Sequence, residues 1–537
     1  MKPPVTVVGG GFAGVEAAWA LAERGEKVRL IEMRPHESTP AHTTSWLAEL
    51  VCSNSFKSRL PTAPAGQLKA EMQALGSLVL RVAAENEVPG GEALAVDRER
   101  FGEAITKAIE EHPNISLERR TFHPDEIGES DTILATGPLT SPDLSAWLAD
   151  LTGRRHLYFY DAVSPTVEAA SLNMDVVFAQ SRYDKGGGDD YLNCPFDKES
   201  YERFVEALVS AERAPIHAFE AGGKRDASPS EAEESFLEKV KYFAGCTPIE
   251  AIAEKGARSL AFSNFKPVGL TDPRTGRRPW AALQLRPENA EKTLYSLVAC
   301  QTRLKWGEQK RVFRLVPGME NAEFVRYGVI HRNTYLDAPR TLSPSLELLA
   351  RPGVYVAGQL TGVEGYVESA AMGIYAGLAL AAKRHRRTMP TPPRATAYGS
   401  LLAHLGDATE REFAPMNINW GLFPMPEPYI KEKRVRQSAK LAAAQEAFAG
   451  WLGQVRKEVP GPLAVPFDLV RATRDIPSQG VELGAEYFVL EPAIWHGNTY
   501  LYCFCEAVDH DAANPLVVLP QGAIKVLDKG TRKTTSP

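Results

Sequence analysis

The stretch Val5-Thr6-Val7-Val8-Gly9-Gly10-Gly11-Phe12-Ala13-Gly14 decides the fold of this chain. Its first four residues predict a buried strand, and the glycines that follow have the spacing Gly-x-Gly-x-x-Gly. Ala13 to Arg24 then predicts a helix that Gly25 closes in a left-handed conformation, and Lys27 to Glu32 predicts a second strand. A strand, turn, helix and strand with short connections are typical of a parallel, doubly wound sheet.

The same stretch predicts a dinucleotide site. In this fingerprint Gly9 permits the turn, Gly11 lets the backbone approach a pyrophosphate, and Gly14 allows close packing of helix on strand. The helix N-terminus then directs its N–H groups toward the phosphates. Glu32 ends the second strand, where a carboxylate accepts hydrogen bonds from ribose hydroxyls. An acid at this position favours FAD or NAD over NADP.

The rest of the chain suggests a divided nucleotide-binding domain. Buried strands are predicted at 131–137 and 353–359, both ending in a glycine turn, and a helix is predicted from Tyr366 to Lys383. These accessory segments shift the choice of nucleotide toward FAD. A helix is predicted from Ile430 to Leu452, and the tail from Val465 to Leu527 alternates apolar and polar residues in short runs.

We therefore predict an α/β chain, with an FAD-binding Rossmann-like doubly wound domain, an inserted α+β domain and a small appended β-domain. The predicted boundaries are 1–189 for the first part of the FAD-binding domain, 190–310 for the insertion, 311–450 for the second part, and 451–537 for the β-domain.

Composition limits the function classes. The net charge of -6 argues against a protein that coats nucleic acid by bulk charge, so RNA binding requires local basic patches. The N-terminus runs directly into a strand, which predicts no targeting leader. The apolar stretch from Ala370 to Ala382 is too short to span a bilayer. Six scattered cysteines predict free thiols in a reducing cytoplasm.

Two cysteines are candidates for chemistry. Cys52 lies where the chain changes from apolar to polar, and Cys246 lies between a glycine and a proline, in a turn that could expose a thiol. A buried, inert thiol is the commoner role of a cysteine, and pattern alone does not decide between the two. Cys503 and Cys505 would share one strand face, but without a second pair they indicate core packing and no metal site.

Basic residues cluster at Arg274 to Arg278, Lys383 to Arg387, and Lys431 to Lys440. Such clusters usually form a solvated face. If they converged around one cleft, they would form a track for a phosphate backbone.

A series of longer motifs resembles one family, the folate- and FAD-dependent tRNA (uracil-5-)-methyltransferases, known as TrmFO. These motifs, spread over about residues 4–450, are Glu49-Leu-Val-Cys-Ser-Asn-Ser55, Asp190-Tyr-Leu-Asn-Cys-Pro195, Gly245-Cys-Thr-Pro-Ile-Glu250, Lys266-Pro-Val-Gly-Leu-Thr-Asp-Pro-Arg-Thr-Gly276, Asn321-Ala-Glu-Phe-Val-Arg-Tyr-Gly328, His331-Arg-Asn-Thr-Tyr335, the stretch 358–369 and the stretch 415–423.

This resemblance implies covalent catalysis. The family's nucleophile matches Cys246, whose thiolate would add to carbon 6 of uracil and make carbon 5 reactive. The second family cysteine matches Cys52, which would remove the carbon 5 proton or handle the methylene adduct near the flavin. Methylenetetrahydrofolate would supply the carbon, reduced FAD would carry and reduce it, and NADH or NADPH would regenerate the reduced flavin.

The resemblance also implies binding residues. His331 and Arg332 are predicted to contact the substrate, as folate or flavin ligands, and Tyr366 could stack on a pteridine. The predicted cofactor-binding residues are Gly9, Gly10, Gly11, Phe12, Ala13, Gly14, Glu32, Gly358, Gln359 and Tyr366. The expected partners are tRNA and folate, with no membrane.

Other functions stay open at this point. The family pattern ends near residue 450, and the extra segment 451–537 leaves ribosomal RNA as an alternative substrate. A flavin-dependent oxidoreductase of a small molecule would use the FAD site without Cys246. The related wobble-uridine modification family carries different sequences around its thiols. An RNA-binding flavoprotein without catalysis would need neither cysteine.

Overall fold

The computed structural model describes most of the chain. The described residues are 2–39, 41–128, 130–153, 157–162, 164–184, 188–214, 247–328, 330–408, 413–459, 469–472, 486–495, 498–504, 517–520 and 524–528. For 157–162, 184, 330–333 and the segments beyond 459, only the backbone is described. Cys246 lies outside these ranges.

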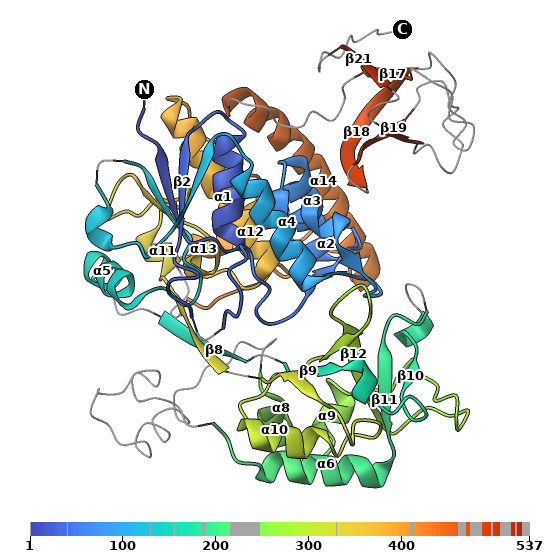
Figure 1. Cartoon of the computed structure of the whole chain (residues 1–537). Coiled ribbons are helices and arrows are strands. Elements are labelled where there is room, and N and C mark those ends of the chain that lie inside the picture. Colours follow the sequence, from blue (N-terminus) through green and yellow to red (C-terminus); the bar gives the residue numbers. More distant parts are fainter. Residues whose placement is uncertain are drawn as a thin grey trace.

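A five-stranded parallel sheet forms the centre of the larger domain (Figure 1). Its order is β16 (Val354–Val356), β7 (Thr132–Leu134), β1 (Val5–Val8), β2 (Val28–Glu32) and β6 (Ile115–Arg119), all in parallel register. β1 lies in the middle and is fully buried, as its apolar sequence requires. The doubly wound sheet that the opening stretch predicted is confirmed, including the return of the chain at β16.

Two helices far apart in sequence pack on each other beside this sheet. They are α1 (Phe12–Ala22) and α12 (Tyr366–Arg384). Their approach depends on glycine, because a Cβ on Gly373 would lie 2.2 Å from the Ala13 carbonyl oxygen. α1 is slightly shorter than predicted, and Gly25 beyond it has a φ of 78°, as expected for a left-handed residue.

Further helices and a small sheet complete this domain around the same core. The helices are α2 (Pro64–Ala74), α3 (Leu78–Glu85), α4 (Arg98–Glu110), α5 (Pro142–Thr152), α11 (Ala338–Thr341), α13 (Ala397–Leu405) and α14 (Lys433–Glu458). The small sheet is β3 (Ser55–Ser58), β5 (Ala93–Val96) and β4 (Glu87–Val88). α14 continues past Leu452, where the helix was predicted to end, because Val455 and Val459 still pack into the core.

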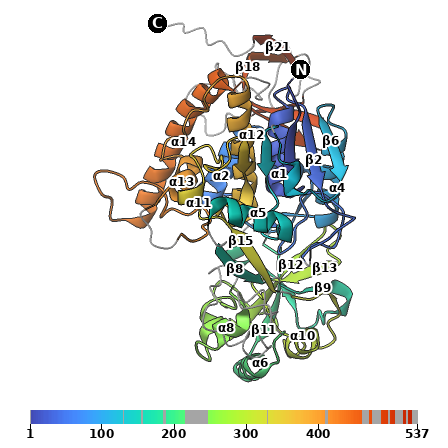
Figure 2. The same cartoon turned by 90° about the vertical axis from the view of Figure 1, so that its left-hand side faces the viewer.

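A second domain lies below the first in Figures 1 and 2, and it has its own apolar core. Its sheet is β10 (Phe178–Ala179), β11 (Leu192–Phe196), β12 (Ala281–Pro287), β13 (Leu294–Leu297), β9 (Thr166–Glu168) and β14 (Phe324–Arg326), with antiparallel pairing. Its helices are α6 (Lys198–Ser210), α8 (Ile249–Ala253), α9 (Ser259–Phe262) and α10 (Trp306–Phe313). The core draws on residues from Val167 to Phe324, a wider span than 190–310, because β9 and β14 pair with each other across the insertion.

Two further sheets are described by their backbone. β8 (Leu157–Ala162) and β15 (Ile330–Tyr335) form an antiparallel pair between the two domains (Figure 2). In the tail, β20 (Val517–Pro520), β19 (Asn498–Phe504), β18 (Glu486–Trp495), β17 (Leu469–Ala472) and β21 (Ile524–Asp528) form one antiparallel sheet in that order. The alternation of the tail sequence predicted such strands.

Among the helices of the described residues, none combines the length and the apolar character that crossing a bilayer requires.

A buried glutamate joins two helices of the larger domain and makes its stability depend on pH. Glu16 in α1 accepts hydrogen bonds from the Ser77 hydroxyl and from the Leu78 and Val79 amides, both at 3.0 Å. Burial raises the pKa of Glu16 from 4.5 to about 7, despite these hydrogen bonds. The folded state therefore binds this proton more tightly, and the resulting stabilisation is lost as the pH rises through about 7.

We expect the free energy of unfolding of wild type, relative to Glu16→Gln, to fall by on the order of 1–3 kcal/mol between roughly pH 5 and pH 8. Urea unfolding of both proteins at several pH values measures this difference. A difference that stays constant across the range would contradict the assignment.

Candidate active site

A cavity of about 470 Å³ opens at the carboxyl ends of the parallel strands. Every strand of the sheet contributes the residues just beyond its end, as ligand sites in such folds require. These residues are Gly9 to Gly11 after β1, Met33 and Arg34 after β2, Arg120 to Phe122 after β6, Ala135 to Gly137 after β7, and Gly358 and Gln359 after β16. Of the predicted cofactor-binding residues, all except Gly14 line this cavity.

The glycines of the turn have three different environments. A Cβ on Gly14 would lie 1.7 Å from the Gly9 carbonyl oxygen, so this residue serves helix–strand packing outside the cavity. Gly9 has a φ of 101°, which a turn requires and which other residues rarely adopt. Gly11 has an ordinary extended backbone, and a Cβ there would meet no described atom within 4 Å. The fold therefore tolerates a side chain at Gly11, and only an occupant of the cavity excludes one.

Gly11 also precedes the first turn of α1, and no side chain caps that helix. The first N–H groups of α1 are directed at the cavity, where a phosphate would accept them. These residues fit the pyrophosphate of a dinucleotide.

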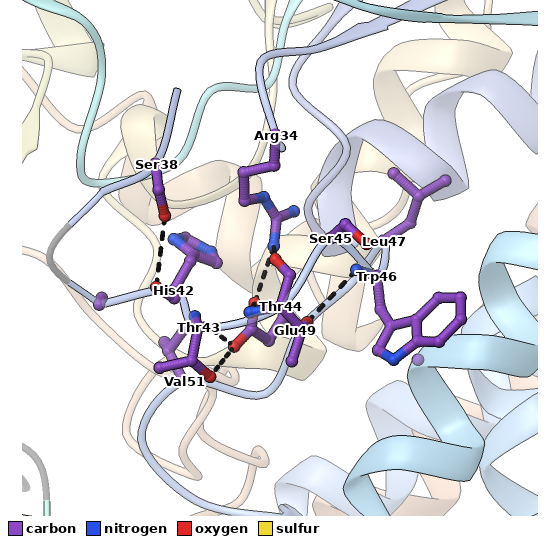
Figure 3. Close-up of polar contacts among 12 residues, drawn as sticks. Arg34, Ser38, His42, Thr43, Thr44, Ser45, Trp46, Leu47, Glu49 and Val51 are labelled. Atoms are coloured by element: carbon purple, nitrogen blue, oxygen red, sulfur yellow. Dashed lines mark hydrogen bonds and ion pairs between the residues drawn. The ribbon is translucent and has the colours of Figure 1, made fainter. Parts of the chain in front are cut away.

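Glu32, the last residue of β2, is held in place by the buried Arg34. Glu32 accepts from the Gly10 amide at 2.7 Å and from Arg34 Nε at 2.8 Å, and Arg34 Nη1 donates to Glu49 at 2.9 Å. Figure 3 shows Glu49 between Arg34 and Thr43. Burial alone would raise the pKa of Glu32, but the hydrogen bonds and charge of Arg34 outweigh it and lower the pKa. The carboxylate is therefore ionised and fixed at the edge of the cavity.

His42 lies in the same loop and lines the cavity (Figure 3). Burial and the nearby Arg34 lower its pKa to about 4. Its ring is neutral at neutral pH, with Nδ1 at 2.6 Å from the Thr39 hydroxyl.

The loop that carries Cys52 is clamped from three directions. Arg98, at the start of α4, donates to the Leu50 carbonyl, and Arg326, in β14 of the second domain, donates to the Val51 carbonyl. The Tyr366 hydroxyl, at the start of α12, accepts from the Cys52 amide at 2.7 Å and lies 2.9 Å from Cys52 Sγ. The sulfur is half-buried and lines the cavity.

These partners favour a negatively charged sulfur. Burial raises the pKa of Tyr366 well above its ordinary value, and the charge of Cys52 adds to this effect. The phenol therefore stays protonated, and its O–H can donate a hydrogen bond to Cys52 Sγ. Arg98 is anchored by an ion pair with the buried Glu288, and its guanidinium and that of Arg326 both interact favourably with a Cys52 thiolate. Nearby cations stabilise thiolates, the reactive form of cysteine.

The second domain closes the cavity from the other side with Arg286 and residues 296–299. Arg286 Nε donates to Asn54 Oδ1 at 2.8 Å. The fully buried Asn54 also donates to the carbonyls of Val96 and Pro287, one in each domain, and so fixes the two domains together beside Cys52.

The segment that follows Cys246 is attached to this cavity wall. The Ile249 amide donates at 2.8 Å to the carbonyl of Gln301, which lines the cavity. Glu250 is buried and accepts from the Thr302 hydroxyl at 2.9 Å and the Arg303 amide at 2.7 Å. The motif glutamate therefore anchors α8, a role that the sequence alone did not indicate.

The other candidate residues are two on strand β15 and two buried cysteines. His331 and Arg332 lie on β15, opposite Asp161 and Tyr160 of β8, and their side chains are outside the described part of the chain. Cys194 and Cys300 are fully buried in the second core, where burial raises the pKa of both thiols. Of the free cysteines in the described residues, Cys52 alone lines the cavity.

Sequence reasoning missed Arg98, Asn54 as a domain clamp, and the pairing of Tyr366 with Cys52. Arg326 and Tyr366 lie within quoted motifs, which was a usable signal. Arg98 lies in a charged helix start that resembles any solvated one.

Tyr366→Phe tests the clamp. This change removes the hydroxyl but keeps the ring that packs on Phe12 at 4.6 Å between centroids. We expect slower alkylation of Cys52 at neutral pH and a rise in the pH at which it becomes reactive, because a hydrogen bond to the thiolate is lost. Iodoacetamide labelling, followed by peptide mass spectrometry across pH, measures the effect, and Phe12→Leu serves as a packing control. An unchanged profile would mean that Tyr366 only packs.

The parallel sheet, the glycine turn and the acid at the end of β2 define a dinucleotide-binding protein of the Rossmann-like, FAD-binding class. The family model described as glucose inhibited division protein A matches residues 4–388. A methylenetetrahydrofolate–tRNA-(uracil-5-)-methyltransferase TrmFO of Symbiobacterium thermophilum is 49% identical over 87% of this chain and 99% of its own length. The TrmFO of Moorella thermoacetica is 50% identical over 83% of this chain and 98% of its own. The chain belongs to the TrmFO family.

The fold agrees with a solved structure. Aquifex aeolicus GidA superimposes with a TM-score of 0.55, over 85% of this chain and 76% of that one, at 15% identity. At this identity the likeness concerns the fold alone. The match to the Symbiobacterium relative covers 87% of this chain, so part of the chain lies outside it.

Proposed function

We propose that this protein transfers a one-carbon unit from methylenetetrahydrofolate to carbon 5 of a uridine in tRNA, in the T-loop, and that the product is 5-methyluridine. We further propose FAD as its bound cofactor, NADH or NADPH as its reductant and the cytoplasm as its place of action. The observation that carries the proposal is the clamped Cys52 thiol, which shares one cavity with the dinucleotide-binding turn.

The cavity residues fit FAD. Gly11 and the N-terminus of α1 would hold the pyrophosphate, Glu32 the ribose, and Gly358 and Gln359 the far end of the cofactor. Bound FAD, in its reduced form, would supply the redox chemistry of the reaction, as carrier of the one-carbon unit and as source of the hydride that completes the methyl group. The contribution of the chain itself is to position the uracil and to move its proton.

Two thiols have complementary roles in this proposal. The Cys246 thiolate forms a bond to carbon 6 of uracil, and the electron pair of the carbon 5–carbon 6 double bond moves to make carbon 5 nucleophilic. After carbon 5 gains the one-carbon unit, its proton passes to the Cys52 thiolate, and the electron pair left on carbon 5 forms a double bond to the new carbon as the bond to its carrier breaks. A hydride added to that carbon completes the methyl group and returns an electron pair to the ring. The bond between Cys246 and carbon 6 then breaks, which restores the ring double bond and the free thiolate.

The position of α8 supports the role of Cys246. Its first residue, Ile249, is bonded to the cavity wall, and three residues of chain span at most about 11 Å. The length of chain between positions 246 and 249 therefore permits the Cys246 thiol to reach the cavity that Cys52 lines.

A methyl-transfer assay tests the proposal. Purified protein is incubated with methylenetetrahydrofolate, NADH or NADPH and unmodified tRNA transcript, and the nucleosides are analysed for 5-methyluridine. Product from tRNA is the expected result. Product from ribosomal RNA alone would keep the chemistry and change the substrate. No product from either RNA, despite bound FAD, would favour an oxidoreductase of small molecules.

A further inference from the structure

A second groove lies on the lower domain, away from the cavity that holds Cys52. It is formed by α9, the loop from 266 to 280 and the start of α6, and none of its lining residues belongs to the first cavity. We call it the arginine groove. Its lining includes four basic side chains and two aromatic ones: Arg258, Lys266, Arg277, Arg278, Phe262 and Trp280.

Two aromatic rings are presented to solvent in this groove. Phe262 is 63% exposed and Trp280 is 37% exposed, although large apolar side chains in this domain are mostly buried. The Arg258 guanidinium lies over both rings, at 4.8 Å from the Phe262 centroid and 5.1 Å from the Trp280 centroid. Exposed rings combined with a stacked arginine are the arrangement on which proteins stack unpaired bases.

The groove is built on ordered elements. The Trp280 amide donates to the Phe196 carbonyl at 2.9 Å, which extends the pairing of β12 with β11. The Ala261 amide of α9 donates to the Tyr201 hydroxyl at 3.1 Å. Binding to such a surface orders few additional groups, so less of the interaction energy is lost.

The charge of the groove is positive and largely unneutralised. Arg258, Lys266, Arg277 and Arg278 are exposed, and among the described residues none of the four is in an ion pair. The acidic residues of the groove already accept hydrogen bonds from their own loops; they are Asp197, Asp272 and Glu320. A positive surface on a chain of net charge -6 indicates a polyanionic partner.

The basic cluster from Lys383 to Arg387, at the end of α12, forms ion pairs within the larger domain. Arg384 pairs with Glu26 and Asp131, and Lys383 pairs with Glu347, so these charges hold the larger domain together. Of the three basic clusters of the sequence, the Arg274 to Arg278 cluster lines the arginine groove, and the other two line neither this groove nor the cavity with Cys52. In the third cluster, Arg436 lies over the exposed ring of Tyr429, at 5.6 Å from its centroid.

One strand links the groove to the reaction centre. Trp280 directly precedes β12, and Arg286 near the end of that strand lines the cavity with Cys52. Six residues of extended strand span about 20 Å. A small substrate cannot occupy both places at once, but a folded RNA can place one nucleotide at each.

We propose that the arginine groove binds an unpaired nucleotide of the RNA substrate and its flanking phosphates, about 20 Å along β12 from the part of the cavity that Arg286 lines. The base stacks on Trp280 and Phe262, and Arg277 and Arg278 neutralise the phosphates. The proposal rests on the proposed function, because it assigns a second contact for that substrate.

The test compares three variants with wild type: Trp280→Ala, the double variant Arg277→Ala/Arg278→Ala, and the control Lys433→Ala/Arg434→Ala. The control removes two exposed basic residues from the first turn of α14. The measurements are the Kd for tRNA transcript at several salt concentrations, the KM and kcat of methyl transfer, the flavin content, and the rate of flavin reduction by NADH or NADPH without RNA.

We expect Trp280→Ala to raise the Kd and KM for tRNA at least about fivefold, and Trp280→Phe to restore most of the affinity. The double variant should lower the salt slope of binding by roughly 0.7 to 0.9 for each arginine. Flavin content and RNA-free flavin reduction should not change, and the control should bind like wild type.

Wild-type affinity for tRNA in both variants would overturn the proposal, and so would an equal loss of affinity in the control. If the same substitutions abolished binding of poly-glutamate but left tRNA binding intact, the groove would be assigned to an acidic protein. That result would also overturn the proposal. Failure of the proposed function is distinct, since wild type itself would then yield no 5-methyluridine from any RNA.

Discussion

A Gly11→Val variant is expected to fold normally and to purify without the yellow colour of FAD. Gly11 has a φ of -77° and a ψ of -173°, an extended conformation that valine adopts readily. Its Cβ would meet no described atom within 4 Å, so the protein itself does not resist the side chain. The side chain would instead occupy the space in front of the first N–H groups of α1, where the pyrophosphate is expected.

Overpacking of this kind weakens FAD binding by roughly tenfold to several hundredfold. The measurements are the visible flavin absorbance per mole of purified protein and the Kd for added FAD, with circular dichroism as the test of folding. Gly450→Val is the matched control, because Gly450 in α14 is equally open to a Cβ and lies outside the cavity. Stoichiometric flavin in Gly11→Val would refute the placement of the cofactor.

Replacement of the Cys246 thiol should have the largest effect on turnover. We expect Cys246→Ala to lower methyl transfer at least about a thousandfold, because carbon 5 of uracil is a poor nucleophile until a thiolate has added to carbon 6. FAD should stay bound, since the cavity-lining residues of the larger domain are unchanged. The assay with tRNA transcript measures the loss, and flavin absorbance measures the cofactor.

Cys300→Ala is the control for the Cys246 variant. Cys300 is a fully buried thiol of the second domain, and burial raises its pKa, so it should not contribute to the chemistry. Retained methyl transfer in Cys246→Ala would remove Cys246 from the mechanism. Loss of bound FAD in that variant would point to a structural role for the motif.

The nucleotide-binding core could be predicted because its determinants are local. The strand at Val5–Val8, the glycine turn, α1 and the left-handed Gly25 follow each other within one stretch, and each has a distinct steric requirement. The predicted strands at 131–137 and 353–359 correspond to the shorter β7 and β16, with the following glycines at the cavity. A buried parallel strand and its turn leave a clear trace in sequence.

The clamp on Cys52 could not be predicted in the same way. Arg98, Arg326 and Tyr366 come from three distant segments, and nothing in their local sequence specifies which carbonyl or sulfur each one contacts. The span of the second domain was also underestimated, because the pairing of β9 with β14 joins residues on both sides of the insertion. Long-range contacts of this kind are properties of the folded chain.

The clamp has a consequence for how the activity depends on the assembly of the whole chain. Arg98 and Tyr366 belong to the larger domain, whereas Arg326 belongs to the smaller one, and all three hold the backbone of residues 50–53. The thiol therefore has its complete set of partners only when the two domains are docked. The chemical reactivity of Cys52 is in effect a reporter of domain docking, and it should be lost before either domain unfolds.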